Sequence, residues 1–133
     1  MASMPVNVPG DAIFDRVGGR PFFDALVTRF YARVEDDPVL RPLYPDDLAE
    51  SVVNTAGFLA QLWGGGTVQY SDHRGHPRLR ARHLPFRIRR LERDRWFAHM
   101  AASVLESDAD DRTKAEMLDY FERAATFLVN AED

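Results

Sequence analysis

The sequence contains no cysteine. This absence excludes disulfide bonds, thiolate zinc sites, iron–sulfur clusters and covalent haem attachment through a C-x-x-C-H motif. Any metal that the protein binds must therefore be held by histidine, carboxylate or another oxygen ligand. The chain supplies four histidines and 21 acidic residues for such a role.

The sequence also lacks any long apolar run. No stretch approaches the roughly 18 apolar residues of a membrane span, and the N-terminal segment MASMPVNVPGD has no apolar run like that of a signal peptide. We therefore expect no membrane partner and a cytoplasmic location. The net charge is −4, which gives no general attraction to nucleic acid, so we expect no nucleic-acid partner either.

The length and composition are those of a globular protein. The chain has 133 residues, of which 45% are hydrophobic and 29% charged. Such a chain is long enough to bury a core without covalent staples, so we expect a single domain over residues 1–133. Residues 1–11 are expected to form a flexible N-terminal extension to it.

No segment shows the alternation that is typical of a strand. Instead, apolar residues repeat with the 3.6-residue period of an amphipathic helix over 21–34, from near Asp47 to the glycines at 64–66, over 93–107 and over 112–130. Three prolines within 37–48 allow only short turns there. Residues 64–76 are expected to form a loop, followed by a very short helix that begins at Pro77 and ends before Pro85. The predicted fold class is all-α.

Residues 73–88, HRGHPRLRARHLPFRI, hold three of the four histidines, and residues 74–95 hold nine arginines. A zinc site is disfavoured because no carboxylate cluster completes it and the arginines would repel a divalent cation. A nucleic-acid patch is disfavoured because no aromatic residues are interleaved and the helix is too short to act as a recognition helix. A solvated arginine face and a site for an anionic cofactor are the two interpretations that stay open.

Three features favour the cofactor. His83 shares a helix face with Leu79, so it points where an apolar side chain points. Basic residues surround this apolar position, as suits an amphipathic anion. Tyr31, Tyr44 and Trp96 lie on or near buried faces, and each needs a hydrogen-bond partner when it is buried. Haem meets these requirements, with a large apolar ring, two propionates and an iron that takes an axial imidazole.

Several motifs also resemble those of a known family. The sequence is similar to the truncated haemoglobins, specifically the group II (O-type) branch, over nearly the whole chain. The matching stretches are RFYARV (29–34), DPVLRPLYPDDL (37–48), FLAQLWGG (58–65), YSDHRGHPRLRARHLPFRI (70–88) and ERDRW (92–96). The resemblance implies a shortened globin with a two-over-two helical sandwich and non-covalent haem b. It also implies that the loop and short helix before His83 replace a full proximal helix.

The resemblance further implies roles for individual residues. On the proximal side, His83 would be the axial ligand of the iron, with Arg82 and Tyr70 as partners of the propionates. On the distal side, Tyr31, Tyr44 and Trp96 would face the bound gas, Ser51 and Thr55 would line the distal gate, and Phe58 would pack against the haem. His73, His76 and His99 match no ligand of the family and are expected to be surface or capping histidines. Thr55 departs from the Leu or Gln that is frequent at its position, and its short side chain can hold only a close partner.

These roles imply a protein that binds oxygen, carbon monoxide and nitric oxide at a histidine-ligated iron. Several hydrogen-bond donors around the gas would slow oxygen release, which favours sensing, scavenging or redox chemistry over bulk transport. One alternative is a haem-dependent peroxidase or nitric oxide dioxygenase that uses an external reductase. A non-haem alternative is a helical interaction module with a basic face. The sequence leaves the oligomeric state open, a homodimer included.

Overall fold

The computed structural model describes residues 12–65 and 88–131, and all regular structure in this part of the chain is helical. The elements in chain order are α1 (Ile13–Arg16), α2 (Arg20–Glu35), the 3-10 turn η1 (Arg41–Leu43), α3 (Ala49–Ala60), the π turn η2 (Gln61–Gly65), α6 (Arg90–Leu105) and α7 (Asp111–Phe127). None of the described helices is long and apolar enough to cross a membrane. The N-terminal extension, most of the predicted loop and the short helix before Pro85 lie outside the described residues.

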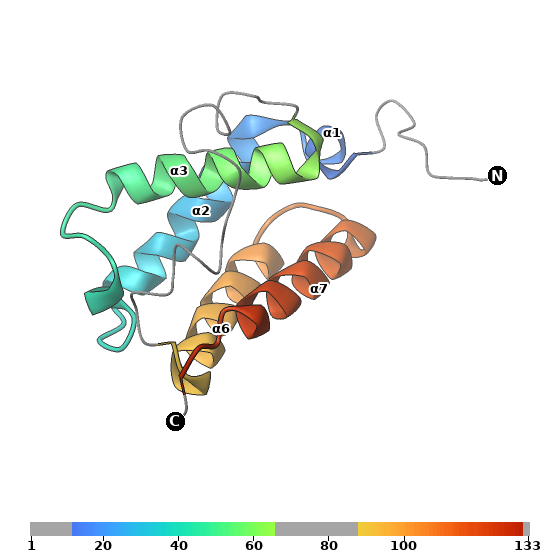
Figure 1. Ribbon diagram of the computed structural model, residues 1–133. Coiled ribbons are helices and arrows are strands. Elements are labelled where there is room, and N and C mark those ends of the chain that lie inside the picture. The colour runs from blue at the N-terminus through green and yellow to red at the C-terminus, as the bar shows by residue number, and fades with distance from the viewer. Residues whose placement is uncertain (1–11, 66–87, 132–133) are drawn as a thin grey trace.

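The four longer helices form two packed pairs. α2 crosses α3 in one pair, α6 lies beside α7 in the other, and α2 also packs on α6, which joins the pairs (Figure 1). The result is an all-α, two-over-two helical sandwich, which confirms the predicted fold class. The core lies where the two pairs meet, and α2 contributes more buried side chains to it than any other described helix.

α2 shows how the sequence builds this core. Gly19 stands at its N-cap with a φ of 87°, and a proline occupies the first turn, where its missing N–H costs nothing. The apolar residues then recur every three or four positions and form one wide buried face. Phe23 and Leu26 have no exposed surface and Phe30 has only 1%. Truncating Phe30 to alanine would cost about 3–5 kcal/mol of folding free energy, the usual range for a buried phenylalanine.

The largest differences from the predicted helices are at the start of α6 and the end of α7, and α6 also ends at Leu105, two residues before the predicted end. α6 begins at Arg90 rather than Arg93, because the Glu92 carboxylate accepts a hydrogen bond of 2.8 Å from the backbone N–H of Arg89 and caps the first turn. α7 ends at Phe127, three residues early. Beyond it the chain turns to Ile88, whose N–H donates to the Asn130 side chain at 2.8 Å and whose carbonyl accepts from the Asn130 N–H at 2.9 Å.

The end of α3 is tied to the start of the described chain. The helical turns continue into η2, where Trp63 leaves helical geometry and Gly64 takes a φ of 99°. A Cβ at Gly64 would lie 2.8 Å from the Cβ of Ala12, so only glycine fits there. The predicted stop at the glycines is therefore confirmed. The four-residue helix α1, which follows Ala12, was missed because so short a segment shows no period.

Candidate functional site

A cavity of about 340 Å³ lies between the two helix pairs. Its walls come from α2, the η1 corner, α3, α6 and α7, and most of them are apolar or aromatic. Five of the predicted site residues line it together, namely Tyr31, Tyr44, Thr55, Phe58 and Trp96. Its size lies within the range of about 300–1,000 Å³ that is usual for small-molecule and cofactor sites.

The Tyr31 side chain enters the cavity from α2. Its hydroxyl makes a hydrogen bond of 2.9 Å with the Thr55 hydroxyl on α3, and either oxygen can be the donor. Burial raises the pKa of Tyr31, and the bond to Thr55 offsets only part of that effect. The phenol therefore keeps its proton at neutral pH and can donate it to a partner in the cavity.

Tyr44 and Trp96 form a second polar pair. Tyr44 follows η1, and its ring packs edge-on against Tyr31 with ring centroids 5.5 Å apart. Trp96 on α6 lines the same cavity, and its indole N–H interacts with the Tyr44 phenol. Burial and the neighbouring Tyr31 raise the pKa of Tyr44, and the Trp96 bond opposes them without cancelling them. Both tyrosines are thus neutral. Tyr31 from α2, Tyr44 from the residue after η1 and Trp96 from α6 all line the same cavity.

Aromatic side chains hold Trp96 in place. Its ring meets the Phe30 ring edge-on at a centroid distance of 5.3 Å and the Phe121 ring at 5.9 Å. Phe58 on α3 also lines the cavity. Such contacts fix the orientation of the indole, so its single N–H points in a defined direction.

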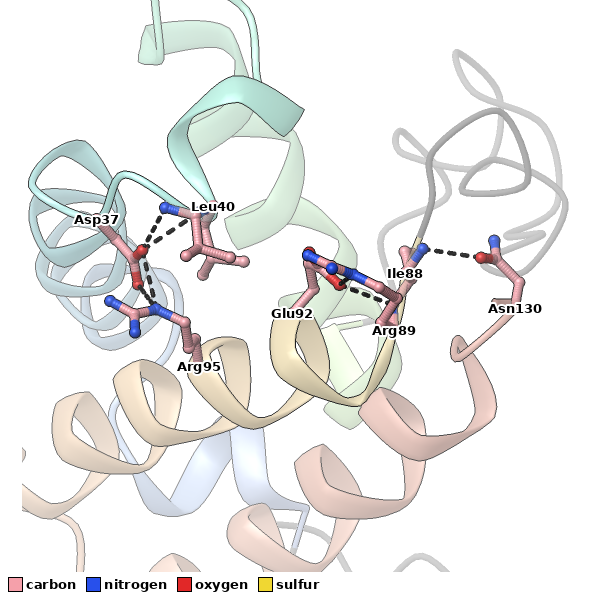
Figure 2. A network of polar contacts seen from close by, with 8 residues as sticks. Asp37, Leu40, Ile88, Arg89, Glu92, Arg95 and Asn130 are labelled. Carbon is pink, nitrogen blue, oxygen red and sulfur yellow. Dashed lines mark hydrogen bonds and ion pairs between the residues drawn. The ribbon is translucent and has the colours of Figure 1, made fainter. Parts of the chain in front are cut away.

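Asp37 is a functional candidate that the sequence analysis missed. Its carboxylate is 1% exposed and accepts a hydrogen bond from Arg95 Nε at 2.9 Å (Figure 2). It also accepts one from His99 Nε2 at 2.7 Å. Burial alone would raise the pKa of the Asp37 carboxyl. Hydrogen bonds from Arg95, His99 and the backbone of Val39 and Leu40 outweigh burial and hold this pKa well below its usual range. The sequence carries one faint sign of the contact, since residues 95 and 99 share a face of α6.

The structure also corrects the interpretation of His99. This residue was expected to be a surface or capping histidine, but its side chain is only 25% exposed and is bonded to Asp37. Ser51 lies one turn before Thr55 on α3 and is not among the described residues that line the cavity, so its place at the distal gate stays a prediction. The other predicted site residues, His83, Arg82 and Tyr70, lie outside the described residues, as do His73 and His76.

Three arginines of the arginine-rich segment are ion-paired in the part that the structure describes. Arg89 binds Glu92, Arg93 lies 3.0 Å from Asp94, and Arg95 is held by a buried carboxylate. The Arg89 guanidinium lowers the pKa of Glu92 to about 2, against the opposing effect of burial (Figure 2). Since these arginines have carboxylate partners, this part of the segment offers little free positive charge to a partner protein.

A second hollow of about 670 Å³ lies against α1, η2 and α7, and Tyr120 lines both this hollow and the first cavity. Charged side chains form much of its wall, and they bind one another. Arg16 contacts Glu116 at 3.1 Å, and Arg123 contacts Asp119 at 2.9 Å. Its wall is more polar than that of the first cavity, which makes the first the better candidate for a ligand site.

Comparison with known proteins gives consistent results. Residues 12–130 match the family described as "Bacterial-like globin". The group 2 truncated hemoglobin YjbI of Bacillus subtilis is 35% identical over 130 residues, which is 96% of this chain and 94% of that protein. The hemoglobin of the thermophilic bacterium Chloroflexus aurantiacus is 44% identical with a TM-score of 0.86, covering 90% of this chain and 98% of that chain. The truncated oxygen-avid haemoglobin from Bacillus subtilis is 33% identical with a TM-score of 0.83, covering 90% of this chain and 100% of that one.

Proposed function

Because this chain belongs to the bacterial-like globins and, within them, to the group II truncated haemoglobins, we propose that it holds haem b non-covalently and binds oxygen reversibly. Membership of this family itself supports globin-type haem and oxygen binding. The finer parts of the proposal are the type of haem, its non-covalent attachment, the gases bound and the role of each residue. Carbon monoxide and nitric oxide are the other expected gases.

The observation that carries the proposal is an apolar cavity with neutral hydrogen-bond donors gathered on one side. Leu40, Phe58 and Leu59 supply apolar wall that suits a porphyrin ring, and Tyr31 and Trp96 bring polar tips to the same space. When bound, haem would supply an iron atom that takes up a diatomic gas. The described residues therefore fit the distal half of a haem site.

The donors act on the gas through charge. Trp96 can only donate, because its indole nitrogen has no lone pair to accept with, whereas the tyrosine hydroxyls can donate and accept at once. Oxygen in such a site takes on partial negative charge and carbon monoxide takes on little. Tyr31, Tyr44 and Trp96 therefore favour oxygen, and Thr55 orients the Tyr31 hydroxyl through their 2.9 Å contact.

Donors of this kind slow the release of oxygen. A hydrogen bond to a charged partner contributes about 1.5–3 kcal/mol, and each 1.4 kcal/mol is about a factor of ten in an equilibrium. Slow release is unsuited to bulk transport and suits sensing, scavenging or redox chemistry. An oxygen-avid relative supports this direction. Redox turnover would take its electrons from an external reductase.

The proximal side of the proposal rests on the family motif alone. We propose His83 as the axial ligand of the iron and Arg82 and Tyr70 as partners of the propionates, since these residues stand in RARHLPF and QYSDHRGHP as in the family. An axial imidazole, a cation and a phenol are side chains that suit these tasks.

A visible spectrum of the purified protein tests the proposal. A strong Soret band, gained at one haem per chain and shifted by oxygen and by carbon monoxide, is the expected result. A protein that stays colourless after reconstitution with haem would refute it and favour a helical interaction module. Peroxide turnover or nitric oxide consumption with a reductant, measured on the same sample, distinguishes an enzyme from a gas-binding protein.

A further inference from the structure

Asp37 lies at the corner between the end of α2 and η1. Its carboxylate accepts hydrogen bonds from this corner and from α6. On its own side, Oδ1 accepts the backbone N–H groups of Val39 at 2.8 Å and Leu40 at 3.3 Å. From α6, Arg95 Nε lies 3.0 Å from Oδ1 and 2.9 Å from Oδ2, and His99 Nε2 lies 2.7 Å from Oδ2. The same carboxylate thus shapes the turn and binds the opposite helix (Figure 2).

The turn shaped by Asp37 carries Tyr44. The carbonyl of Asp37 accepts the Arg41 N–H at 2.8 Å. The Arg41 guanidinium then donates to the carbonyls of Tyr44 at 3.3 Å, Pro45 at 2.8 Å and Asp46 at 2.7 Å. The backbone of Tyr44 is therefore fixed relative to Asp37 by two successive sets of hydrogen bonds.

The helix held by Asp37 carries Trp96. Arg95 precedes Trp96 directly, and His99 follows it by three residues, so the two contacts of α6 with Asp37 bracket the indole. Tyr44 and Trp96 line the same cavity from the two sides of this junction between the corner and α6. We propose that Asp37 is a positioning residue, which sets the corner and α6 at the separation that places Tyr44 and Trp96 together in the cavity.

Geometry explains why a carboxylate serves here better than an apolar contact. A buried ion pair gives little net stability, because the loss of hydration offsets the attraction between the charges. It does fix direction and distance, since each hydrogen bond tolerates only a narrow range around 2.7–3.2 Å. Without these bonds α6 could shift against the corner, which would move Trp96 away from Tyr44 in the cavity. Its consequence for oxygen binding rests on the function proposed above.

Two variants break the junction in different ways. Asp37→Asn keeps an oxygen for the turn and places an amide NH₂ toward α6, where the Arg95 guanidinium can only donate. Arg95→Met keeps a long unbranched side chain and removes the guanidinium, and because the Arg95 side chain is 41% exposed this variant should fold even where Asp37→Asn does not. Ile13→Ala is the control for lost stability. Ile13 is 6% exposed and lies in α1, which precedes the N-terminal end of α2, whereas Asp37 follows the C-terminal end of that helix.

The first readout does not depend on haem. It is the exchange of the Trp96 indole N–H with solvent, followed by NMR in the purified protein and assigned by its loss in Trp96→Phe. We expect exchange about tenfold faster in Asp37→Asn and Arg95→Met, the factor that corresponds to 1.4 kcal/mol. The Trp63 indole N–H should be unchanged in these two variants, and Ile13→Ala, whose helix packs on η2 beside Trp63, should leave the Trp96 signal unchanged.

The second readout is the ratio of oxygen to carbon monoxide dissociation rates, which we expect to rise about fivefold in both variants as the donor pair loosens. Unchanged Trp96 exchange, or equal changes at Trp63 and in Ile13→Ala, would overturn the role of Asp37. If the wild type takes up no haem while Trp96 exchange responds as expected, the proposed function is wrong and the positioning role of Asp37 stands.

Discussion

Replacing Trp96 with phenylalanine removes one N–H donor from the cavity and little else. The new ring can still meet Phe30 and Phe121, whose centroids lie 5.3 and 5.9 Å from that of the indole. The Tyr44 hydroxyl loses its donor but keeps its proton, because burial raises its pKa. The variant therefore tests the hydrogen bond and leaves the aromatic packing in place.

The size of the effect follows from what the indole does before the gas arrives. Its N–H interacts with the neutral Tyr44 phenol, and a hydrogen bond to a neutral acceptor of this kind would contribute about 0.5–1.5 kcal/mol. A bond to oxygen with partial negative charge would contribute about 1.5–3 kcal/mol. The difference is about 1–1.5 kcal/mol, which predicts oxygen release about fivefold to tenfold faster in Trp96→Phe.

Stopped-flow displacement of oxygen and of carbon monoxide from the wild type and from Trp96→Phe is the assay. Carbon monoxide release should change much less than oxygen release, because that gas gains little from a donor. Equal changes for the two gases would show that Trp96 acts by its bulk. Unchanged oxygen release would show that Tyr31 and Tyr44 carry the stabilisation without it.

Three further predictions concern the rest of the site. His83→Ala should lose haem or bind it weakly, because it removes the proposed axial ligand, whereas His99→Ala should keep a normal haem content and spectrum. Arg82→Ala should speed haem transfer to an acceptor protein by at most about fivefold at low salt, since an exposed ion pair contributes about 0–1 kcal/mol and is screened. Folding lowers the pKa of Glu92 from 4.5 to about 2, so its ionised form stabilises the fold above pH 4.5 and that contribution is lost as the pH falls to 2. The free energy of unfolding, measured with urea, should therefore fall more steeply over that pH range in the wild type than in Glu92→Gln.

Each of these has a contradicting outcome. Wild-type haem content in His83→Ala would disprove the axial assignment. A rate of haem loss in Arg82→Ala that equals the wild-type rate at low salt would remove Arg82 from the site. Parallel pH profiles for the wild type and Glu92→Gln would show that the Glu92–Arg89 contact is as strong in the unfolded chain.

The positions of the longer helices could be predicted because their cause is local. An apolar residue every three or four positions requires a helix if those residues are to meet on one side, and α2 follows its predicted span to within one residue at each end. The start of α6 depends on a local cap, Glu92 on the Arg89 N–H, that the apolar period does not show, whereas the late end assigned to α7 has a non-local cause. The turn after α7 closes on Ile88, which is 42 residues from Asn130 in the chain.

The site residues also divide into those that a local pattern predicts and those that it does not. Tyr31 on a buried helix face is a local inference, whereas its meeting with Tyr44, Thr55 and Trp96 was foreseen from a family resemblance. Asp37 escaped because its partners lie 58 and 62 residues away, and an acidic residue before a proline is explained well enough as the end of a helix. Pairings at such separations leave no periodic trace in the sequence.

The polar groups of the cavity satisfy one another before any ligand arrives. Tyr31 bonds to Thr55, and the Trp96 N–H interacts with the Tyr44 phenol, so these contacts reduce the penalty of burying the polar groups. A gas must then compete with a hydrogen bond that already exists. Only a ligand with enough negative charge gains free energy when it replaces that hydrogen bond. The contacts that stabilise the cavity before a gas binds therefore also favour oxygen over carbon monoxide.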